Sequence, residues 1–558
     1  MPVFKYPIGL VERVIQGLSL EEVRDALFRL KCETDIIDDN ILEVEVNPDR
    51  PDMYSIEGIK RAVYGLLRLE KGWNAPPVED TPVTIVTSMP ATRPYIGGAI
   101  IYNINIRDED DLKQIIQFQE KLHDTIGRRR RKAAIGLHDL SKLPSRTLHY
   151  KELDLNTASF EPLTGGGKMS AKEVLASTEQ GQKYGNISRR DEMHPFLLAG
   201  DSIIAMPPVI NSSITAVEVG TKDVFVDVTG TDERIVSKTL DILVSNLAER
   251  PGARIGRVSI VAPDGSTMRT PRLERENTVL DVGLIRDVLG YEITAYEASL
   301  HLGYMRFNAK PTGKGRVLVE IPPFRADIIG AIDLVEDVAI SIGYESLYPL
   351  GIDVSTRGKL EHATIMERRT RDIMIGLGFT EIMRLVLTSP DLALLSSKQP
   401  VEVRNPVQRD YSFLRPSIGV SLLGALRDNL HAPKPVKIFE IGPVAYVSGN
   451  SIVEKNMLGM AVMDDEVSIE QIQAPLYSLL RIMGIPFRPA PECAEKYYIP
   501  GRCGVLKLDG RTIALYGEVK PEILERLGVD YPVAIAEVDM EEIVGWKYRT
   551  SRRELEYR

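Results

Sequence analysis

Cysteine is scarce in this chain, which contains three cysteines among 558 residues. Cys32, Cys493 and Cys503 show no Cys-x-x-Cys spacing and have no nearby histidines that could complete a metal site. We therefore expect no zinc site. A low cysteine content without a pairing pattern is typical of cytosolic proteins, so we interpret all three as reduced, buried thiols.

Long hydrophobic runs are also absent. A membrane-spanning helix needs about 20 consecutive apolar residues, and the apolar runs in this sequence are much shorter, so we expect no contact with a membrane. The first residues, MPVFKYPIGLVERV, include a glutamate and lack the basic flank of a secretory signal. Residues 161–173, EPLTGGGKMSAKE, lack the spacing of a phosphate-binding nucleotide loop and predict a flexible turn leading into a helix.

Basic residues are outnumbered: 69 Lys and Arg stand against 79 Asp and Glu, for a net charge of −10. Such a chain can bind RNA only through local basic patches or through a partner subunit. One basic run, residues 128–132, directly follows a helix predicted over residues 110–126. Its four arginines either steer RNA phosphates or complement the C-terminal dipole of that helix.

The length indicates several domains, because single cores rarely exceed about 250–300 residues. Ser19 and Glu22 have the spacing of a helix capping box, and residues 41–46 alternate as a half-buried strand does. A polar, proline-bearing stretch at residues 73–84 is a plausible linker. We expect an α+β, multidomain chain whose domains span residues 1–75, 85–265, 266–350 and 351–558.

An unusually acidic helix is predicted from Ala331, after a strand at residues 317–321. Its carboxylates Asp333, Glu336 and Asp337 stand at i, i+3 and i+4 and repel one another, and Asp327 lies just upstream. Four acids at one helix start call for a counter-charge, and Mg²⁺ held by oxygen ligands fits that need. The alternative is a solvated acidic face that complements the helix dipole.

Small polar residues gather around two β-rich runs, residues 202–205 and 224–228. They could line a pocket that hydrogen-bonds a hydroxyl group, although the same residue types also populate turns. The candidates are Asn211, Ser212, Ser213, Thr215, Glu218, Asp227, Thr229 and Thr231. His138 is a further candidate, although a lone histidine more often packs or hydrogen-bonds than catalyses.

The run IPPFRADIIGAIDLVEDVAISIGYESL resembles the central segment of phenylalanyl-tRNA synthetase beta subunits of the archaeal and eukaryotic type. NPDRPDMYSIEGIKR resembles a structural motif of their N-terminal domain. The resemblance extends from Asn47 to the segment beginning at Gly517. It implies that Asp327, Asp333, Glu336 and Asp337 hold a magnesium ion shared with an alpha subunit.

The same resemblance implies that residues 85–265 form a mixed-sheet editing domain that hydrolyses tyrosine wrongly attached to the phenylalanine tRNA. An apolar synthetic pocket rejects an added hydroxyl only weakly, so a second site that hydrogen-bonds the hydroxyl supplies the discrimination. Glu218 is our first choice for recognising the hydroxyl, with Asn211 and residues 229–231 in the pocket wall. No Ser-His-Asp or metal arrangement is apparent, so we expect the tRNA's own hydroxyl to activate the water.

The C-terminal region alternates strands and helices and predicts a largely antiparallel sheet similar to a class II synthetase catalytic domain. Residues 439–442, Phe-Glu-Ile-Gly, resemble the second class II motif. The segment VAIAEVDMEEIV lacks the glycine-rich sequence ending in arginine that would hold ATP. We therefore expect a catalytic-like scaffold that cannot activate an amino acid alone.

These observations together predict the beta subunit of an (αβ)₂ phenylalanine–tRNA ligase. It would be cytoplasmic, bind tRNA(Phe) and the alpha subunit, and use Mg²⁺, while the alpha subunit binds ATP. Two alternatives stay open. One is a stand-alone Mg²⁺-dependent hydrolase built on the four acids, and the other is an assembly and tRNA-binding subunit with an inactive editing pocket.

Overall fold

The computed structural model describes residues 2–349, 351 and 356–556, with side chains up to residue 548. The chain divides into two compact units, Met1–Ile352 and Asp353–Arg558. Both mix helices and sheets, so the predicted α+β, multidomain class is confirmed. None of the helices in the described ranges is long and apolar enough to cross a membrane.

The first unit begins with a three-stranded antiparallel sheet of order β1-β3-β2. Its strands are β1 (Val3–Pro7), β2 (Glu33–Ile37) and β3 (Ile41–Glu45). Helices α1 (Ile8–Val14), α2 (Leu20–Arg29) and α3 (Ile56–Leu66) accompany it. The predicted capping box of Ser19 and Glu22 is present at the start of α2.

A ten-stranded sheet forms the centre of the first unit, in the order β12-β11-β10-β7-β4-β14-β5-β13-β6, with β15 paired to β14. Its first strands are β4 (Val78–Thr87), β5 (Tyr95–Tyr102), β6 (Ala133–Asp139) and β7 (Thr147–Asp154). The others are β10 (Met193–Ala199), β11 (Ser202–Met206), β12 (Ile210–Asn211), β13 (Val224–Gly230), β14 (Arg254–Val261) and β15 (Thr267–Thr270). The strands predicted at residues 202–205 and 224–228 are therefore confirmed.

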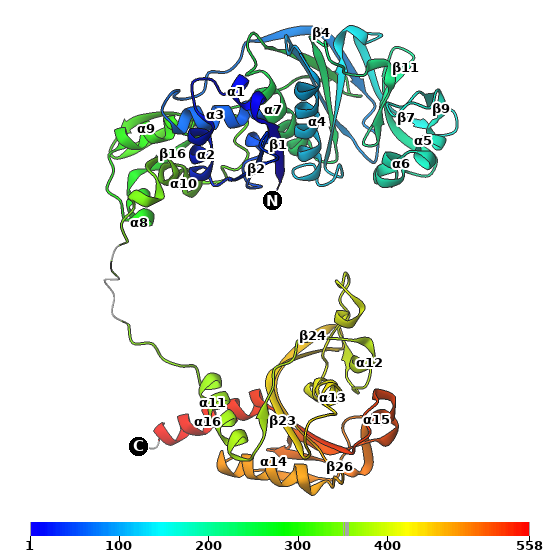
Figure 1. The fold of residues 1–558 in the computed structure, drawn as a ribbon, viewed down its shortest axis with the longest axis vertical. Coiled ribbons are helices and arrows are strands. Elements are labelled where there is room, and N and C mark those ends of the chain that lie inside the picture. Colours follow the sequence, from blue (N-terminus) through cyan, green and yellow to red (C-terminus); the bar gives the residue numbers. More distant parts are fainter. Residues whose placement is uncertain (1, 350, 352–355, 557–558) are drawn as a thin grey trace. The chain divides into compact units, whose positions relative to one another are not determined.

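Two helices cover one end of this sheet (Figure 1). They are α7 (Glu233–Leu247), which packs on β5 and β13, and α4 (Glu109–Asp124), which packs between β6 and β1. Beyond the opposite end lie the short elements β8 (Ser159–Phe160), β9 (Met169–Ser170), α5 (Ala171–Ser177) and α6 (Glu179–Tyr184). The predicted turn before α5 is present, with Gly165, Gly166 and Gly167 all at positive φ.

A third sheet, of order β16-β18-β17, completes the first unit. Its strands are β16 (Glu276–Asp281), β17 (Asn308–Gly313) and β18 (Arg316–Ile321). Three helices pack against it or against one another: α8 (Val282–Leu289), α9 (Ala295–Tyr304) and α10 (Ala331–Ile342). Strand β18 and the start of α10 at Ala331 confirm the elements predicted around the acidic segment.

The second unit is built on an eight-stranded, largely antiparallel sheet of order β19-β23-β24-β28-β27-β26-β25, with β21 beside β23. Its long strands are β23 (Val436–Ser448), β24 (Ser451–Met463), β26 (Tyr498–Leu508), β27 (Arg511–Val519) and β28 (Val533–Asp539). The shorter ones are β19 (Thr380–Glu381), β21 (Gln399–Pro400) and β25 (Arg488–Ala490).

Apolar side chains alternate between the two faces of this sheet and build a core on each. Leu458, Met460 and Val462 face helices α11 (His362–Gly376), α14 (Glu470–Ile482) and α16 (Met540–Glu556). Ala461 and Met463 face α13 (Ile418–Asp428) and α15 (Pro521–Leu527). Figure 1 shows α13 inside the curve of β23 and β24.

Two expectations about the second unit are wrong. Cys493 and Cys503 form a disulfide instead of remaining reduced, because the pairing of β25 with β26 brings their Cα atoms to 5.3 Å; Cys32 is free and buried as expected. The segment EIMRLVL, residues 381–387, predicts a strand from its sequence, but in the structure that strand is interrupted. The backbone N–H of Arg384 donates to the Glu440 carboxylate at 3.3 Å instead of joining a ladder.

Candidate functional site

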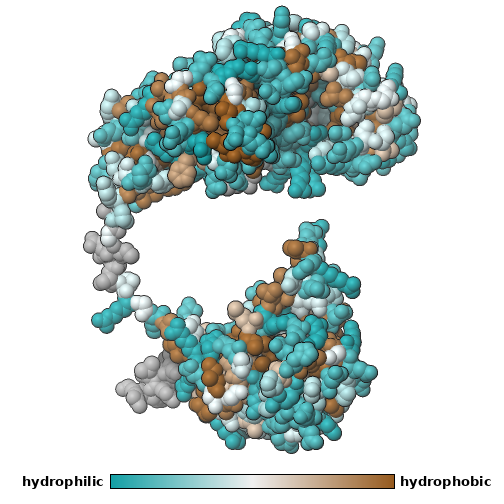
Figure 2. All heavy atoms as spheres, viewed as in Figure 1, coloured by the Kyte–Doolittle hydropathy of each residue, from teal (hydrophilic) through white to brown (hydrophobic). Residues whose placement is uncertain are grey.

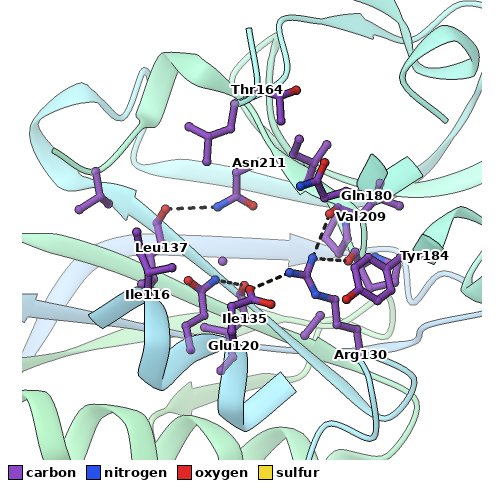
Figure 3. Close-up of a pocket in the computed structure, with 18 of the residues that line it drawn as sticks. Ile116, Glu120, Arg130, Ile135, Leu137, Thr164, Gln180, Tyr184, Val209 and Asn211 are labelled. Atoms are coloured by element: carbon purple, nitrogen blue, oxygen red, sulfur yellow. Dashed lines mark hydrogen bonds and ion pairs between the residues drawn. The ribbon is translucent and has the colours of Figure 1, made fainter. Parts of the chain in front are cut away.

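A cavity of about 480 Å³ opens beside the edge strand β6 of the large sheet (Figure 3). Its walls come from α4, β6, α6 and the turn that precedes β12, and most of them are apolar, including Ile115, Ile116, Leu137 and Val209. The polar groups are fewer. They are supplied by Gln119, Glu120, Arg130, Thr164, Glu179, Gln180, Lys183, Asn211 and Asp227.

Asp227 is the carboxylate that β13 presents to this cavity, and its side chain is almost fully buried. It lies opposite Gly136 of β6 in the strand register. A Cβ atom added to Gly136 would come within 2.1 Å of Asp227 Oδ1. The Asp227 carboxylate can therefore occupy this position only because residue 136 has no side chain.

His138 and Thr215 hold Asp227 from behind. His138 Nε2 lies 2.9 Å from Asp227 Oδ1, and His138 Nδ1 lies 2.7 Å from Thr215 Oγ1. All three side chains are buried. Both ring nitrogens of His138 are therefore engaged, and the residue positions the carboxylate rather than reaching the cavity. Among the described residues, Asp227 Oδ2 receives no hydrogen bond.

A second charged group also lines the cavity. Arg130 donates to Glu120 Oε1 at 2.7 Å and to the carbonyl oxygens of Pro208 and Val209 at 3.2 and 3.0 Å. Its guanidinium lies over the Tyr184 ring, 4.4 Å from the centroid (Figure 3). Burial would raise the pKa of Glu120, but the hydrogen bond from His123 and the charges of His123 and Arg130 lower it to about 2.

Of the other predicted residues, Asn211 lines the cavity and donates to the Leu137 carbonyl at 3.2 Å. Thr229 lies on β13 two residues from Asp227, where its Oγ1 accepts from buried Arg93 at 2.9 Å. Burial lowers the pKa of Arg93 to about 10. Ser212 donates to the Glu161 carbonyl at 3.0 Å.

Of the predicted residues, only Asn211 and Asp227 line the cavity, and three of the others also make no contact with Asp227. Glu218 is 66% exposed at its side chain and pairs with Lys142 at 2.7 Å. Ser213 lies in a short 3₁₀ turn, residues 213–215, and exposed Thr231 donates to the Arg131 carbonyl at 3.4 Å. None of the three is among the residues that line the cavity. Of the two acidic residues predicted here, Asp227 therefore has the position that Glu218 was expected to have.

The four acids of the α10 segment have separate partners. Arg325, itself buried, donates to Asp327 Oδ2 and Asp337 Oδ2, both at 2.6 Å. Asp333 accepts from the backbone N–H groups of Ile329 and Gly330 at 2.7 and 2.8 Å. Glu336 pairs with Lys31 at 2.7 Å. Burial raises the pKa of Asp337, against the opposing charge of Arg325.

As placed here, these side chains do not form a cation site. Arg325 already supplies the counter-charge for the two buried acids, and Asp333 caps the helix. In the described ranges no group of three or more His, Cys, Asp or Glu side chains could hold a metal ion. Magnesium binding stays a prediction, and nothing in this arrangement supports a hydrolase built on the four acids.

The motif resembling a class II synthetase holds a buried ion pair. Glu440 of β23 accepts from Arg415 Nη1 at 2.6 Å, and both side chains are at most 2% exposed. A Cβ atom at Gly442 would lie 2.4 Å from Arg415 Nη2. The hollow above Gly442 is therefore filled by the chain's own arginine.

Comparison with known proteins gives consistent matches along the chain. The family model described as "Phenylalanyl tRNA synthetase beta chain CLM domain" matches residues 352–540, and that described as "tRNA synthetase B5 domain" matches residues 278–344. The phenylalanine–tRNA ligase beta subunit of Aeropyrum pernix is 48% identical over 553 residues, which are 99% of this chain and 100% of that protein. The chain belongs to the family of phenylalanine–tRNA ligase beta subunits. The resemblance carried by the sequence motifs is thereby confirmed.

Other members of this beta-subunit family are more distant. The protein of Saccharolobus solfataricus is 39% identical over 532 residues, 94% of this chain and 96% of its own. A solved N-terminal fragment of the phenylalanyl-tRNA synthetase beta subunit from Pyrococcus horikoshii is 34% identical, with a TM-score of 0.58. That similarity covers 62% of this chain and 100% of the fragment.

Most of the residues that line the cavity were not predicted from sequence, among them Gly136, Glu120, Arg130 and Tyr184. Gly136 had a usable signal, because a glycine inside a strand pattern often marks a close approach of another group. Arg130 was recognised as part of a basic run, but sequence could not show that this arginine alone turns inward. Glu120 and Tyr184 had no distinguishing signal.

Proposed function

We propose that this chain is the beta subunit of a heterotetrameric phenylalanine–tRNA ligase and that its cavity edits tyrosyl-tRNA(Phe). Attachment of phenylalanine with ATP takes place in the alpha subunit, and the assembled enzyme works in the cytoplasm. Family membership supports the first statement. One observation carries the second: a buried carboxylate, Asp227, in a largely apolar cavity of about 480 Å³.

Recognition in this proposal depends on one hydroxyl group. The tyrosine ring packs against the apolar wall, and its hydroxyl donates to Asp227 Oδ2. Phenylalanine offers no such donor and would leave Asp227 Oδ2 buried without water or a partner, which costs about 1–3 kcal/mol. A site built in this way can discriminate against the analogue that lacks the hydroxyl by about 10⁴-fold.

Hydrolysis in this proposal relies on positioning. His138 has no free ring nitrogen, and the described residues around the cavity include no serine or cysteine. The chain therefore holds the ester in place and leaves activation of the water to the terminal ribose hydroxyl of the tRNA. Correct placement of reacting groups alone can supply several kcal/mol of rate enhancement.

Assembly with an alpha subunit is supported by exposed apolar side chains. Met383 and Val407 of the second unit are 93% and 99% exposed, and Ile329 next to α10 is 94% exposed. Figure 2 shows hydrophobic residues reaching the visible surface of both units. Contiguous exposed hydrophobic patches mark surfaces that contact another protein, and Leu385 and Leu387, 62% and 38% exposed, follow Met383 closely in the chain.

The proposal is tested by deacylation of tyrosyl-tRNA(Phe), with phenylalanyl-tRNA(Phe) as the comparison, by the full chain together with its alpha subunit. We expect selective hydrolysis by the wild type. Asp227→Ala should lower the preference for the tyrosyl ester by at least about 100-fold. Glu218→Ala, an exposed carboxylate outside the cavity, is the matched control and should behave as wild type.

Two results would contradict this assignment. Loss of selectivity in Glu218→Ala with Asp227→Ala unaffected would return the recognition role to Glu218. Absence of hydrolysis in the wild-type complex would leave an assembly and tRNA-binding subunit with an inactive cavity.

A further inference from the structure

The basic run at residues 128–132 forms a turn whose place next to the cavity was not evident from sequence. It follows the end of α4, and Arg128, Arg129 and Arg130 have φ angles of 47°, 54° and 64°. Three consecutive residues with side chains in the left-handed region are uncommon, because Cβ then crowds the backbone. We call residues 128–132 the arginine turn.

Hydrogen bonds at both ends fix the arginine turn. The N–H of Arg130 donates to the His123 carbonyl at 3.1 Å, and the N–H of Lys132 donates to the Gly127 carbonyl at 2.9 Å. Buried Arg93 donates to the Arg130 carbonyl at 3.1 Å. The Arg130 side chain then enters the cavity wall, bound to Glu120 and to two carbonyl oxygens. The turn is therefore a fixed part of the cavity rim.

The neighbours of Arg130 point elsewhere. Arg128, Arg129 and Arg131 are exposed. Within the part of the chain that the structure describes, none of these three side chains forms an ion pair or a hydrogen bond, whereas most of the chain's ion pairs do engage an arginine. Three unpaired positive charges at one turn are notable in a chain whose net charge is −10.

We propose that the arginine turn binds phosphates of the single-stranded 3′ end of an aminoacyl-tRNA whose amino acid occupies the cavity. This inference rests on the proposed editing function. Arg130 lines the cavity, and its neighbours in sequence on both sides are exposed arginines. The tRNA backbone that leaves the cavity therefore meets the charges of these arginines first. Phosphate contacts of this kind fix the position of a nucleic acid without reading its sequence.

The test uses a triple variant, Arg128→Gln, Arg129→Gln and Arg131→Gln, which keeps side-chain length and removes charge. The matched control is Arg146→Gln. Arg146 is also exposed and directly precedes β7, near Tyr102 at one end of strand β5. The arginine turn directly precedes Ala133, which the strand register places near Tyr95, at the other end of β5. Each full chain is assembled with its alpha subunit.

The first measurement is binding of a fluorescent acceptor-stem minihelix with a single-stranded 3′ end, by anisotropy, at several salt concentrations. We expect the Kd of the triple variant to rise at least about tenfold and the slope of log K against log salt to become shallower by about 2, since each single-strand phosphate contact contributes about 0.7. Arg146→Gln should match the wild type. An unchanged Kd and slope in the triple variant would overturn the proposal.

The second measurement separates charge from structure. Tyrosyl-adenosine carries the same ester but no phosphates, so the triple variant should hydrolyse it at the wild-type rate while its KM for tyrosyl-tRNA rises. Loss of both activities would show that the turn merely shapes the cavity. If the wild type hydrolyses neither substrate, the editing function fails by itself, and the anisotropy result still decides whether the turn binds RNA.

Discussion

Two buried aspartates of the first unit lie in different electrostatic surroundings. Asp227 faces the cavity and is hydrogen-bonded to His138 at 2.9 Å. Asp241 lies on α7 with 4% of its surface exposed and accepts one backbone N–H, from Leu273, at 3.3 Å. Burial raises the pKa of Asp241 to about 7, and the Leu273 hydrogen bond opposes this shift only in part.

The raised pKa of Asp241 predicts a pH-dependent stability. The folded state binds a proton at this residue more firmly than the unfolded chain, so the contribution is fully present below about pH 4 and is lost as the pH rises through about 7. Asp241→Asn should therefore be more stable than wild type at pH 8, by as much as about 4 kcal/mol, because the wild-type carboxyl must lose its proton in a buried site. Thermal unfolding of both proteins between pH 4 and pH 8 measures this.

The comparison contains its own control, because the advantage of Asp241→Asn should shrink to under about 1 kcal/mol near pH 4, where the carboxyl is protonated in the folded state and about half protonated in the unfolded chain. A difference in unfolding temperature that does not change with pH would contradict the prediction.

At the scale of residues, the sequence predicted a hydroxyl-binding pocket and supplied Asp227, Asn211 and His138. Sequence alone could not show which of these residues faces the cavity, because that depends on which strands pair. The register that places Asp227 opposite Gly136 joins residues about 90 positions apart. Glu218 is the first choice within the block that resembles the editing domain, and only the structure shows its carboxylate paired with Lys142 at the surface.

At the scale of elements, two motifs that are distant in sequence meet through buried charges. In the turn before α3, Arg50 donates to Asp52 at 2.8 and 2.9 Å, and Arg61 of α3 lies 3.6 Å from the Phe324 ring centroid. Phe324 adjoins Arg325, which holds Asp327 and Asp337. The N-terminal motif and the acidic helix therefore belong to one packed region.

This arrangement predicts a large cost for removing Arg325. Arg325→Met would leave two carboxylates buried without their counter-charge, and we expect it to lower the free energy of unfolding by about 3–5 kcal/mol. Lys31→Met removes a half-buried lysine that pairs with Glu336 and Asp49, both of them at least 43% exposed at the side chain, and as the control it should cost about 0–1 kcal/mol. Denaturant unfolding of the chain without its partner measures both.

Because Arg325 already pairs with both Asp327 and Asp337, a chelator should leave the unfolding temperature of the isolated wild-type chain unchanged. A clear drop with chelator that magnesium reverses would restore the predicted metal site.

At the scale of the whole molecule, the first unit should fold without the second. An N-terminal fragment similar to 62% of this chain yields a solved structure by itself, and the cavity, Asp227 and the arginine turn all lie within the first unit. We expect a fragment ending at residue 349 to unfold cooperatively and to retain hydrolysis of tyrosyl-adenosine. Calorimetry and the deacylation assay check this, and a fragment that is folded but inactive would show that the second unit completes the site.

Much of this architecture was predictable because local patterns and tertiary packing agree. The α10 helix, β18 and the capped α2 each have an apolar period that matches the face they bury. The two wrong predictions for the second unit also share a cause. The disulfide and the interrupted strand after Glu381 both depend on which distant segment lies alongside, which no local pattern contains.

Under the proposed editing function, the cavity would distinguish amino acids by the presence of a hydrogen-bond donor at the para position and not by ring size. Among para-substituted phenylalanine analogues, an amino substituent would satisfy Asp227 as a hydroxyl does, whereas fluorine offers no donor. An engineered ligase carrying this subunit would therefore remove the para-amino analogue from tRNA and retain the para-fluoro one. Substituting Asp227 with alanine would then increase the number of unnatural amino acids that remain attached to the tRNA.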